Sequence, residues 1–265
     1  MLNVLGKIRR KLIAEQRASN YLLYALGEIV LIVIGILIAV QINDWNSARK
    51  ARQLERGILV EMQDDLQKTM ADLDYDLERH ISRLASSLLI QEFLAGELPY
   101  HDSLDRHFTL LRDDYQVFPK LGAFELLRAR GLELISNDSL RRSVTDLFEL
   151  DMPRVVTSGV DYTGTRNINA LMTPMLDRHA TLSSTPLNKS TSPRLSAEPV
   201  SATTNITVFA YTIRDHNALR ADDTFRIKLQ DALVIRRKKI RDHLELKQQI
   251  ENALLAIRNH LATLN

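Results

Sequence analysis

A long apolar segment near the N-terminus constrains this 265-residue chain more than any other feature. Residues 29–40 carry no polar side chain, and largely apolar sequence extends from Tyr21 to Ile42. A helix of these 22 residues would be about 33 Å long, enough to cross a hydrocarbon layer of about 30 Å. No later segment has comparable length. We therefore predict one transmembrane helix over residues 21–44.

Aromatic residues at both ends of this segment support the same interpretation. Tyr21 and Tyr24 precede the apolar run and Trp45 follows it, at the positions where amphipathic rings favour the headgroup level. A cleaved signal peptide would have a shorter apolar region and small residues at its cleavage site, which the sequence after Val40 does not offer. A helix in the core of a soluble protein would rarely be apolar on every face for so long.

Cations flank the segment on both sides, five upstream and four downstream, so their count gives a weak orientation signal. The upstream cations belong to a tail of 20 residues, whereas a long following domain translocates largely regardless of its charge. We therefore expect the N-terminus in the cytoplasm and residues 45–265 on the far side of the inner membrane, in a periplasm. The absence of cysteine is compatible with that location.

The first 20 residues form a basic amphipathic pattern. Met1, Leu5, Ile8 and Leu12 share one helical face. Cations surround that face, namely Lys7, Arg10, Lys11 and Arg17. We expect this segment to lie at the cytoplasmic surface of the bilayer, where each cation contributes about 1 kcal/mol of attraction to anionic lipid headgroups. A nucleic-acid-binding arm is the alternative.

Glu28 is the one ionisable residue inside the predicted span, and Gly35 lies seven residues further on the same helical face. A carboxylate in hydrocarbon is costly and usually faces protein or water, and glycine lets a second helix approach closely. Glu28 and Gly35 are therefore candidates for a face between membrane helices, which would make the protein a homo-oligomer or bind it to another membrane protein. Alternatively the hydrophobic span begins at Ile29 and Glu28 reaches the headgroups.

Composition favours an all-α fold. The chain has nine glycines and seven prolines, few for its length, and no cysteine, which excludes disulfides, cysteine-ligated metals and thiol nucleophiles. Its 35 Lys and Arg nearly balance its 33 Asp and Glu, so no overall charge draws it to nucleic acid. We predict no cofactor and no nucleic-acid partner.

Two long helices are predicted in the exported domain. From Trp45 to about Ala95, apolar residues recur every three or four positions, including Leu54, Ile58 and Ile81. From about Asp222 to Leu264 the apolar residues follow a heptad, typical of a coiled coil, with Arg236, His243 and Lys247 as its polar exceptions. We expect the two helices to pack antiparallel in an elongated bundle. A cationic cluster on the second helix is interpreted as a solvated face: Arg236, Arg237, Lys238, Lys239 and Arg241.

Shorter elements lie between the long helices. Helices are expected over residues 103–115, over two segments within 121–150 separated by Gly131, and over 154–178. A helix–turn–helix DNA reader at 121–150 is disfavoured by its long turn and acidic flanks. Residues 181–207 are rich in Ser, Thr and Pro and predict a flexible loop, while 206–213 fits a short strand or a helix start.

Common catalytic motifs are missing from the sequence. It contains no nucleophile elbow, phosphate-binding glycine loop or His-Glu-x-x-His pattern. Asp72, Asp74 and Asp76 resemble the start of a calcium loop, but the required glycine and closing glutamate are absent. Asp76 with His80 is interpreted as an ordinary helix pair. A cluster at a helix start suggests capping rather than metal binding: His101, Asp102, Asp105 and His107.

Two segments resemble a known family. They are similar to recurrent segments of an uncharacterised bacterial membrane-protein family, the domain of unknown function 6090. The first segment runs from Tyr21-Leu-Leu-Tyr-Ala-Leu-Gly-Glu-Ile through Gln41-Ile-Asn-Asp-Trp-Asn46, and the second from Phe124-Glu-Leu-Leu-Arg-Ala-Arg-Gly-Leu through Leu140. The resemblance implies one N-terminal anchor, a helical exported domain and a glutamate at position 28. It implies no reaction.

From these features we expect a non-enzymatic, membrane-anchored sensor, scaffold or interaction protein, which is oligomeric. The first alternative is a subunit of an ion-coupled or force-transmitting membrane complex that uses Glu28. The second is a hydrolase with dispersed catalytic residues, which a structure without any polar cleft would exclude.

Overall fold

The chain is built almost entirely from helices, as the sequence predicts. The structure, a computed structural model, describes the backbone of residues 17–157, 167–186 and 207–264, and the side chains of 26–156, 167–182 and 210–264. Its longest element is the helix α2, Arg17–Ala95, and its second longest is α9, Asp223–Thr263. Two compact units divide the chain, residues 1–57 and residues 58–265.

The first unit contains the N-terminal part of α2. Described side chains from Leu26 to Leu54 are exposed, including the large apolar side chains that follow Glu28. This part of α2 holds an 18-residue window with a mean hydropathy of 2.3, none of it buried in the structure. Within the described residues α2 is the one helix that is long and apolar enough to cross a membrane.

Glycine ends α2 where the sequence predicts. Gly96 adopts a φ of +82°, a conformation that L side chains rarely take, and its N–H donates to the Phe93 carbonyl at 3.1 Å. Pro99 follows three residues later and could not continue the helix. The chain then turns back into the body of the second unit.

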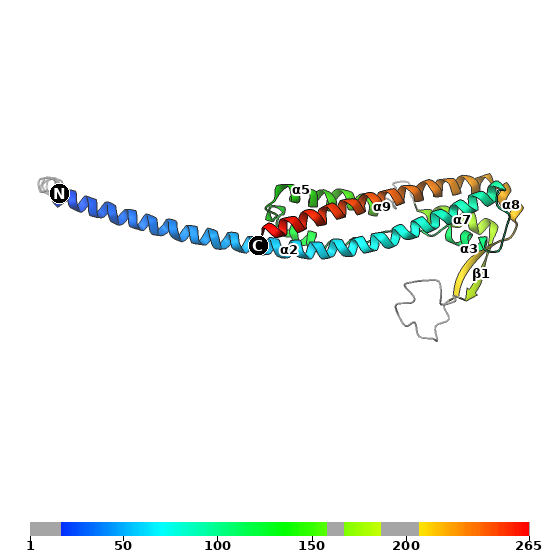
Figure 1. The fold of residues 1–265 in the computed structure, drawn as a ribbon, viewed down its shortest axis with the longest axis horizontal. Helices are drawn as coiled ribbons and strands as arrows, with labels where there is room; N and C mark the ends of the chain where they lie inside the picture. The colour runs from blue at the N-terminus through cyan, green and yellow to red at the C-terminus, as the bar shows by residue number, and fades with distance from the viewer. Residues whose placement is uncertain (1–16, 158–166, 187–206, 265) are drawn as a thin grey trace, which may run out of the picture. The chain divides into compact units, whose positions relative to one another are not determined.

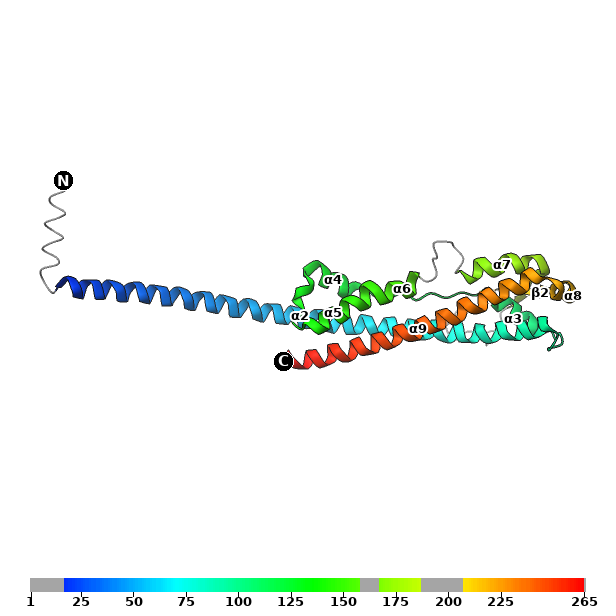
Figure 2. The same ribbon diagram turned by 90° about the horizontal axis from the view of Figure 1, so that it is seen from above.

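In the second unit, α9 lies antiparallel to the Ile58–Ala95 part of α2 (Figures 1 and 2). Contacts along the pair confirm the direction: Arg220, just before α9, donates to the Phe93 carbonyl at 3.1 Å, and Lys247 pairs with Asp74 at 2.6 Å. Asp222 caps the start of α9 by accepting a hydrogen bond from the Phe225 N–H at 3.1 Å.

Short helices pack against this pair. They are α3 Leu104–Leu110, α4 Gly122–Arg130, the 3-10 turn η1 Leu132–Leu134, α5 Asp138–Asp146, the π-turn η2 Leu147–Asp151, α6 Met152–Thr157, α7 Ile168–His179 and α8 His216–Ala221. The predicted helices over 103–115 and 121–150 are confirmed with shorter bounds. In place of one helix over 154–178 the structure has α6 and α7, and residues 158–166 lie outside its description.

A β-hairpin corrects the sequence analysis. Strand β1, Ala180–Pro186, pairs antiparallel with β2, Thr207–Ile213, in the register Ala180 to Ile213. Residues 181–186, predicted as loop, are therefore strand, and 206–213 is resolved in favour of a strand from Thr207; the rest of the predicted loop lies outside the described residues. Tyr211 and Ile213 are buried, and β-branched and aromatic residues favour such a half-buried surface.

Apolar side chains form two separate cores in the second unit. The first core gathers Ile58 to Leu73 of α2, the α4–α6 region and Leu246 to Ile257 of α9. The second core gathers Ile90 to Leu94 of α2, the helices α3 and α7, the hairpin and Phe225 to Leu233 of α9. Between them both long helices turn polar side chains inward, at residues 76–87 and 236–243.

The apolar residues that recur along α2 are not all buried. Leu54 is 39% exposed and Ile81 is 51% exposed, while the neighbouring His80 is fully buried. The apolar period alone favoured Ile81, but the helix faces α9 with the adjacent residue. His80 therefore packs in the interior at the place where the apolar pattern of the sequence favoured Ile81.

Candidate functional site

The membrane-segment residues singled out from the sequence lie on α2. Glu28 and Gly35 are exposed, and nothing lies within 4 Å of a Cβ built on Gly35. Trp45 is 61% exposed, with the Arg49 guanidinium 5.9 Å from its ring centre. For Arg17, Tyr21 and Tyr24 only the helical backbone is described, and Lys7, Arg10 and Lys11 lie outside the described residues.

A buried polar layer between the two cores was not predicted as a site. On α9, Arg236 is 0% exposed and Lys239 is 5% exposed, whereas Arg237 and Arg241 of the same cationic cluster are exposed. The interpretation of the whole cluster as a solvated face is therefore wrong for Arg236 and Lys239. Both occupy the side of α9 that packs on the rest of the domain.

Arg236 ties α9 to the chain that follows α3. Its Nη2 donates to the carbonyls of Leu111 at 3.2 Å and Asp113 at 3.0 Å. Burial lowers the pKa of Arg236 to about 10, against the opposing effect of the Asp114 and Asp113 carboxylates. The guanidinium therefore stays charged at neutral pH, buried beside acidic residues.

Lys239 forms the central ion pair of the layer. Its Nζ lies 2.5 Å from Asp114 Oδ1, with Lys239 buried and Asp114 partly buried. Asp114 also accepts hydrogen bonds from the N–H of Tyr115 and of Ile168, each at 3.1 Å. One carboxylate thus joins α9, the segment after α3 and the start of α7, and its charge is matched by Lys239.

Two histidines face each other at the centre of the layer. The rings of His80 and His243 meet edge to face with their centres 5.3 Å apart. His80 Nε2 donates to the Tyr115 carbonyl at 3.2 Å, and His243 Nδ1 donates to the Lys239 carbonyl at 2.8 Å. Carbonyls only accept, so these bonds assign the N–H of each ring to that nitrogen.

Both histidines are neutral at neutral pH. Burial has the largest effect on the pKa of His80, and together with the electrostatic effects of His243, Lys239 and Arg236 it lowers this pKa to about 3. Burial also lowers the pKa of His243. Asp76 and His80, interpreted from sequence as an ordinary helix pair, are both buried, with Asp76 4% exposed and His80 0% exposed.

Tyr115 extends the layer toward the surface. The guanidinium groups of Arg79 and Arg83 each lie 5.3 Å from its ring centre, and Arg79 lies 4.0 Å from the ring of Tyr75. Arg83 Nη2 donates to Asp113 at 3.1 Å. Burial and the neighbouring Asp113 carboxylate raise the pKa of Tyr115, so its phenol remains protonated.

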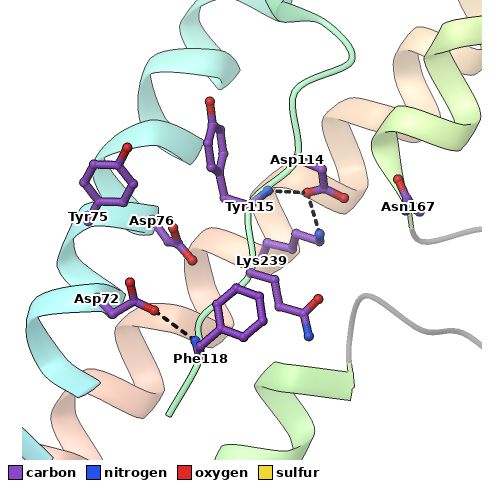
Figure 3. Close-up of a pocket in the computed structure, with 9 residues that line it drawn as sticks. Asp72, Tyr75, Asp76, Asp114, Tyr115, Phe118, Asn167 and Lys239 are labelled. Atoms are coloured by element: carbon purple, nitrogen blue, oxygen red, sulfur yellow. Dashed lines mark hydrogen bonds and ion pairs between the residues drawn. The ribbon is translucent and has the colours of Figure 1, made fainter. Parts of the chain in front are cut away.

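A cavity of about 410 Å³ opens beside this layer (Figure 3). Figure 3 shows Asp72, Tyr75 and Asp76 on α2, facing the segment that carries Asp114, Tyr115 and Phe118. Lys239 reaches the cavity from α9. The complete lining is Asp72, Tyr75, Asp76, Asp114, Tyr115, Gln116, Phe118, Asn167 and Lys239.

The metal candidates weighed from sequence are used in other ways. Asp74 pairs with Lys247, Asp105 accepts from the Tyr100 hydroxyl at 3.2 Å, and His107 Nδ1 lies 3.0 Å from Ser86 Oγ. His101 Nδ1 accepts the Ser103 N–H at 3.2 Å. Among the residues with described side chains, no group of three or more His, Asp or Glu could hold a metal ion.

One sequence signal could have revealed the polar layer. Arg236 and His243 interrupt the apolar heptad of α9 at positions where a core residue is expected. A polar residue at such a position either finds a polar partner inside the bundle or marks the point where the apolar core stops. Its partners on α2 and after α3 were not predictable, because nothing local in the sequence specifies them.

The fold and site thus define a helical protein with one candidate membrane helix and a polar pocket in the second unit. The model of a family of unknown function, DUF6090, matches residues 28–175. The chain therefore belongs to this family, which confirms the resemblance noted in its sequence. Comparison with curated proteins and with solved structures gave no match.

Proposed function

We propose that the protein is a membrane-anchored, non-enzymatic sensor or scaffold that presents its helical second unit outside the inner membrane. The observation that carries this proposal is the composition of α2. One helix contains the exposed apolar segment and, about thirty residues later in sequence, the cavity residues Asp72, Tyr75 and Asp76. A change at the cavity would act on the same helix that enters the bilayer.

The lining of the cavity favours binding over covalent chemistry. Its nine residues include no Ser, Thr or His to act as a nucleophile with its base. Asp114 and Lys239 are engaged with each other and with backbone N–H groups. The presence of a polar cleft keeps the hydrolase alternative testable, but these engagements support a recognition role.

Sidedness follows from the charges of the N-terminal tail. We infer that Lys7, Arg10, Lys11 and Arg17 contact anionic headgroups at the cytoplasmic surface and that residues 45–265 lie in the periplasm. Nucleic acid is not a partner in this arrangement, because the basic N-terminal segment, the alternative nucleic-acid-binding arm, would be held against the bilayer.

Because the natural chain lacks cysteine, single cysteines report sidedness without background. Ser82→Cys places a thiol on the exposed face of α2 in the second unit, and Ser19→Cys places one before the apolar segment. We expect a membrane-impermeant maleimide to label Ser82→Cys in cells with a permeabilised outer membrane, and Ser19→Cys only after lysis. The reverse labelling pattern would contradict the orientation.

Oligomerisation is proposed through the membrane helix. Glu28 and Gly35 share one helical face, and Gly35 leaves open space for a neighbouring helix. Disulfide crosslinking from cysteines placed singly along residues 28–42 should give dimers with a helical period that peaks on this face. Crosslinking without a period would contradict a specific interface.

An ion-coupled or force-transmitting complex is the alternative function, favoured by the ionisable Glu28 in an apolar segment. It predicts that Glu28→Gln abolishes the cellular phenotype while expression and oligomer size stay unchanged. A functional Glu28→Gln variant would exclude this alternative and leave the sensor or scaffold role intact.

A further inference from the structure

A groove between α2 and α3 shares no lining residue with the cavity described above. Its volume is about 420 Å³, which falls within the range of known ligand pockets. Each helix contributes residues at the spacing i, i+3, i+4 and i+7, which places them on one face of that helix. The lining from α2 is Ser82, Ala85, Ser86 and Leu89, and the lining from α3 and the residue before it is Ser103, Arg106, His107 and Leu110.

A hydrogen bond joins the two walls of this α2–α3 groove. His107 Nδ1 lies 3.0 Å from the Oγ of Ser86, which is 3% exposed. The Ser86 hydroxyl donates to the Ser82 carbonyl at 3.2 Å, so its oxygen accepts from the N–H of His107. Ser86 is therefore engaged as donor and acceptor, which favours a structural role for the pair over a reactive serine.

Arg106 gives the groove a positive charge. In the part of the chain that the structure describes, no carboxylate lines the groove, and the exposed Arg106 side chain forms no ion pair or hydrogen bond. The acids beside it on α3 do not pair with it: Asp105 accepts from the Tyr100 hydroxyl at 3.2 Å, and the described residues show no ion pair between Arg106 and Asp102. The guanidinium is thus open to an anionic ligand.

His107 adds no second charge at neutral pH. Burial, and to a lesser extent the charge of Arg106, lower the pKa of His107 from its ordinary value of 6.5. The imidazole is therefore neutral at pH 7, and the lining carries the single charge of Arg106. A ligand with one negative charge matches this lining, whereas a doubly charged phosphate monoester would keep one charge unmatched.

Aliphatic side chains form a second, independent feature of the groove. Ala85 is exposed and Leu89 and Leu110 are half-buried, and these three residues are called the aliphatic wall below. An inorganic anion at Arg106 would leave this wall in contact with water. An anion with an alkyl chain would remove part of its apolar surface from water, which favours binding.

We propose that the α2–α3 groove binds a small aliphatic carboxylate, with its carboxylate group at Arg106 and its alkyl chain against the aliphatic wall. A planar guanidinium matches the geometry of a carboxylate and can donate two parallel hydrogen bonds to it. The proposal rests on the sensor role proposed above and names the class of ligand that the sensor recognises. The ligand would contact α2, the helix that also carries the exposed apolar segment.

The test measures binding to the full chain in a neutral detergent by saturation-transfer difference NMR, with detergent alone as the blank. Three probes share a five-carbon chain and differ in charge: pentanoate, pentan-1-ol and pentylammonium. We expect pentanoate to bind, with the other two probes binding at least threefold more weakly. Equal or tighter binding of pentan-1-ol or pentylammonium, or no binding of pentanoate, would overturn the proposal.

Variants locate the site. Arg106→Gln should weaken pentanoate binding about three- to fivefold, the size expected for an ion pair that water partly screens. Ala85→Leu places extra carbon atoms in the groove and should weaken binding at least about threefold by excluding the alkyl chain. Arg237→Gln is the matched control, since Arg237 is an exposed arginine on α9 outside the groove. Its affinity should equal that of the natural chain.

Unchanged affinity in Arg106→Gln would overturn the carboxylate site whatever the result for Ala85→Leu, and so would an equal loss in Arg237→Gln. Arg106 and Ala85 are both exposed, so these variants keep the packed cores, and far-UV circular dichroism checks that they fold. Loss of the carboxylate site would leave membrane anchoring and sidedness intact, since the maleimide-labelling experiment tests those separately.

Discussion

Individual buried residues set how this domain responds to acid. His80 and His243 meet inside the polar layer, and the charged groups that act on them are Lys239, Arg236, Asp114 and Asp242. The folded pKa of His80, about 3, lies well below the ordinary value of 6.5. Between these two values the unfolded chain binds a proton that the folded chain does not, so stability falls as pH falls from about 6.5 toward 3.

We therefore expect the free energy of unfolding to drop by about 1 kcal/mol per pH unit between pH 6 and pH 5 because of His80, with a further contribution of the same sign from His243. Urea unfolding followed by circular dichroism at pH 7, 6 and 5 measures this dependence. His80→Gln should reduce the slope, and an identical slope in the variant would contradict the assignment of a buried, neutral His80.

Arg236 and Arg237 give a direct comparison of a buried and an exposed arginine on α9. Arg236→Ala removes the donor to the Leu111 and Asp113 carbonyls and leaves a void, for an expected loss of about 2–4 kcal/mol of unfolding free energy. Arg237→Ala should stay within about 0.5 kcal/mol. Chemical unfolding measures the loss of unfolding free energy in both variants. Equal losses would contradict the buried position of Arg236.

At the scale of elements, two glycines differ in whether the backbone conformation requires glycine. Gly131 ends α4 with a φ of +104°, and an added Cβ would lie 2.2 Å from the Glu133 carboxylate. Gly57 lies within α2 with open space where its Cβ would be. The first glycine is required by its conformation and the second is not.

Gly131→Ala should therefore destabilise the domain by about 1–2 kcal/mol. Gly57→Ala should stabilise it by up to about 1 kcal/mol, because alanine favours the helix. Thermal unfolding by circular dichroism compares the two. A melting temperature for Gly131→Ala at or above that of the natural chain would contradict the positive φ.

Helix ends were predictable because local chemistry determines them. Gly96 ends α2 and Asp222 starts α9, both as the sequence indicates. The hairpin was missed because composition rich in Ser, Thr and Pro favours loops, and only the pairing of β1 with β2 across a long sequence gap makes residues 180–186 a strand. Pairing partners of that kind leave no local signal.

At the scale of the whole molecule, the all-α architecture and the family could be predicted from sequence, whereas the cavity could not. Apolar periodicity identifies two long helices, but it assigns polar residues to the surface by default. Lys239 and Asp114 are 125 residues apart, and their pairing depends on how the 111–121 segment crosses the helix pair. The candidate site is thus a property of tertiary packing.

The central claim is that α2 anchors the chain in a membrane, and fractionation of cells tests it most directly. Broken cells producing the full chain, or a variant lacking residues 1–44, are extracted with alkaline carbonate and separated by ultracentrifugation. The account predicts that the full chain stays in the membrane pellet until detergent is added and that the truncated variant is released to the supernatant. A full-length chain found in the supernatant without detergent would contradict the account.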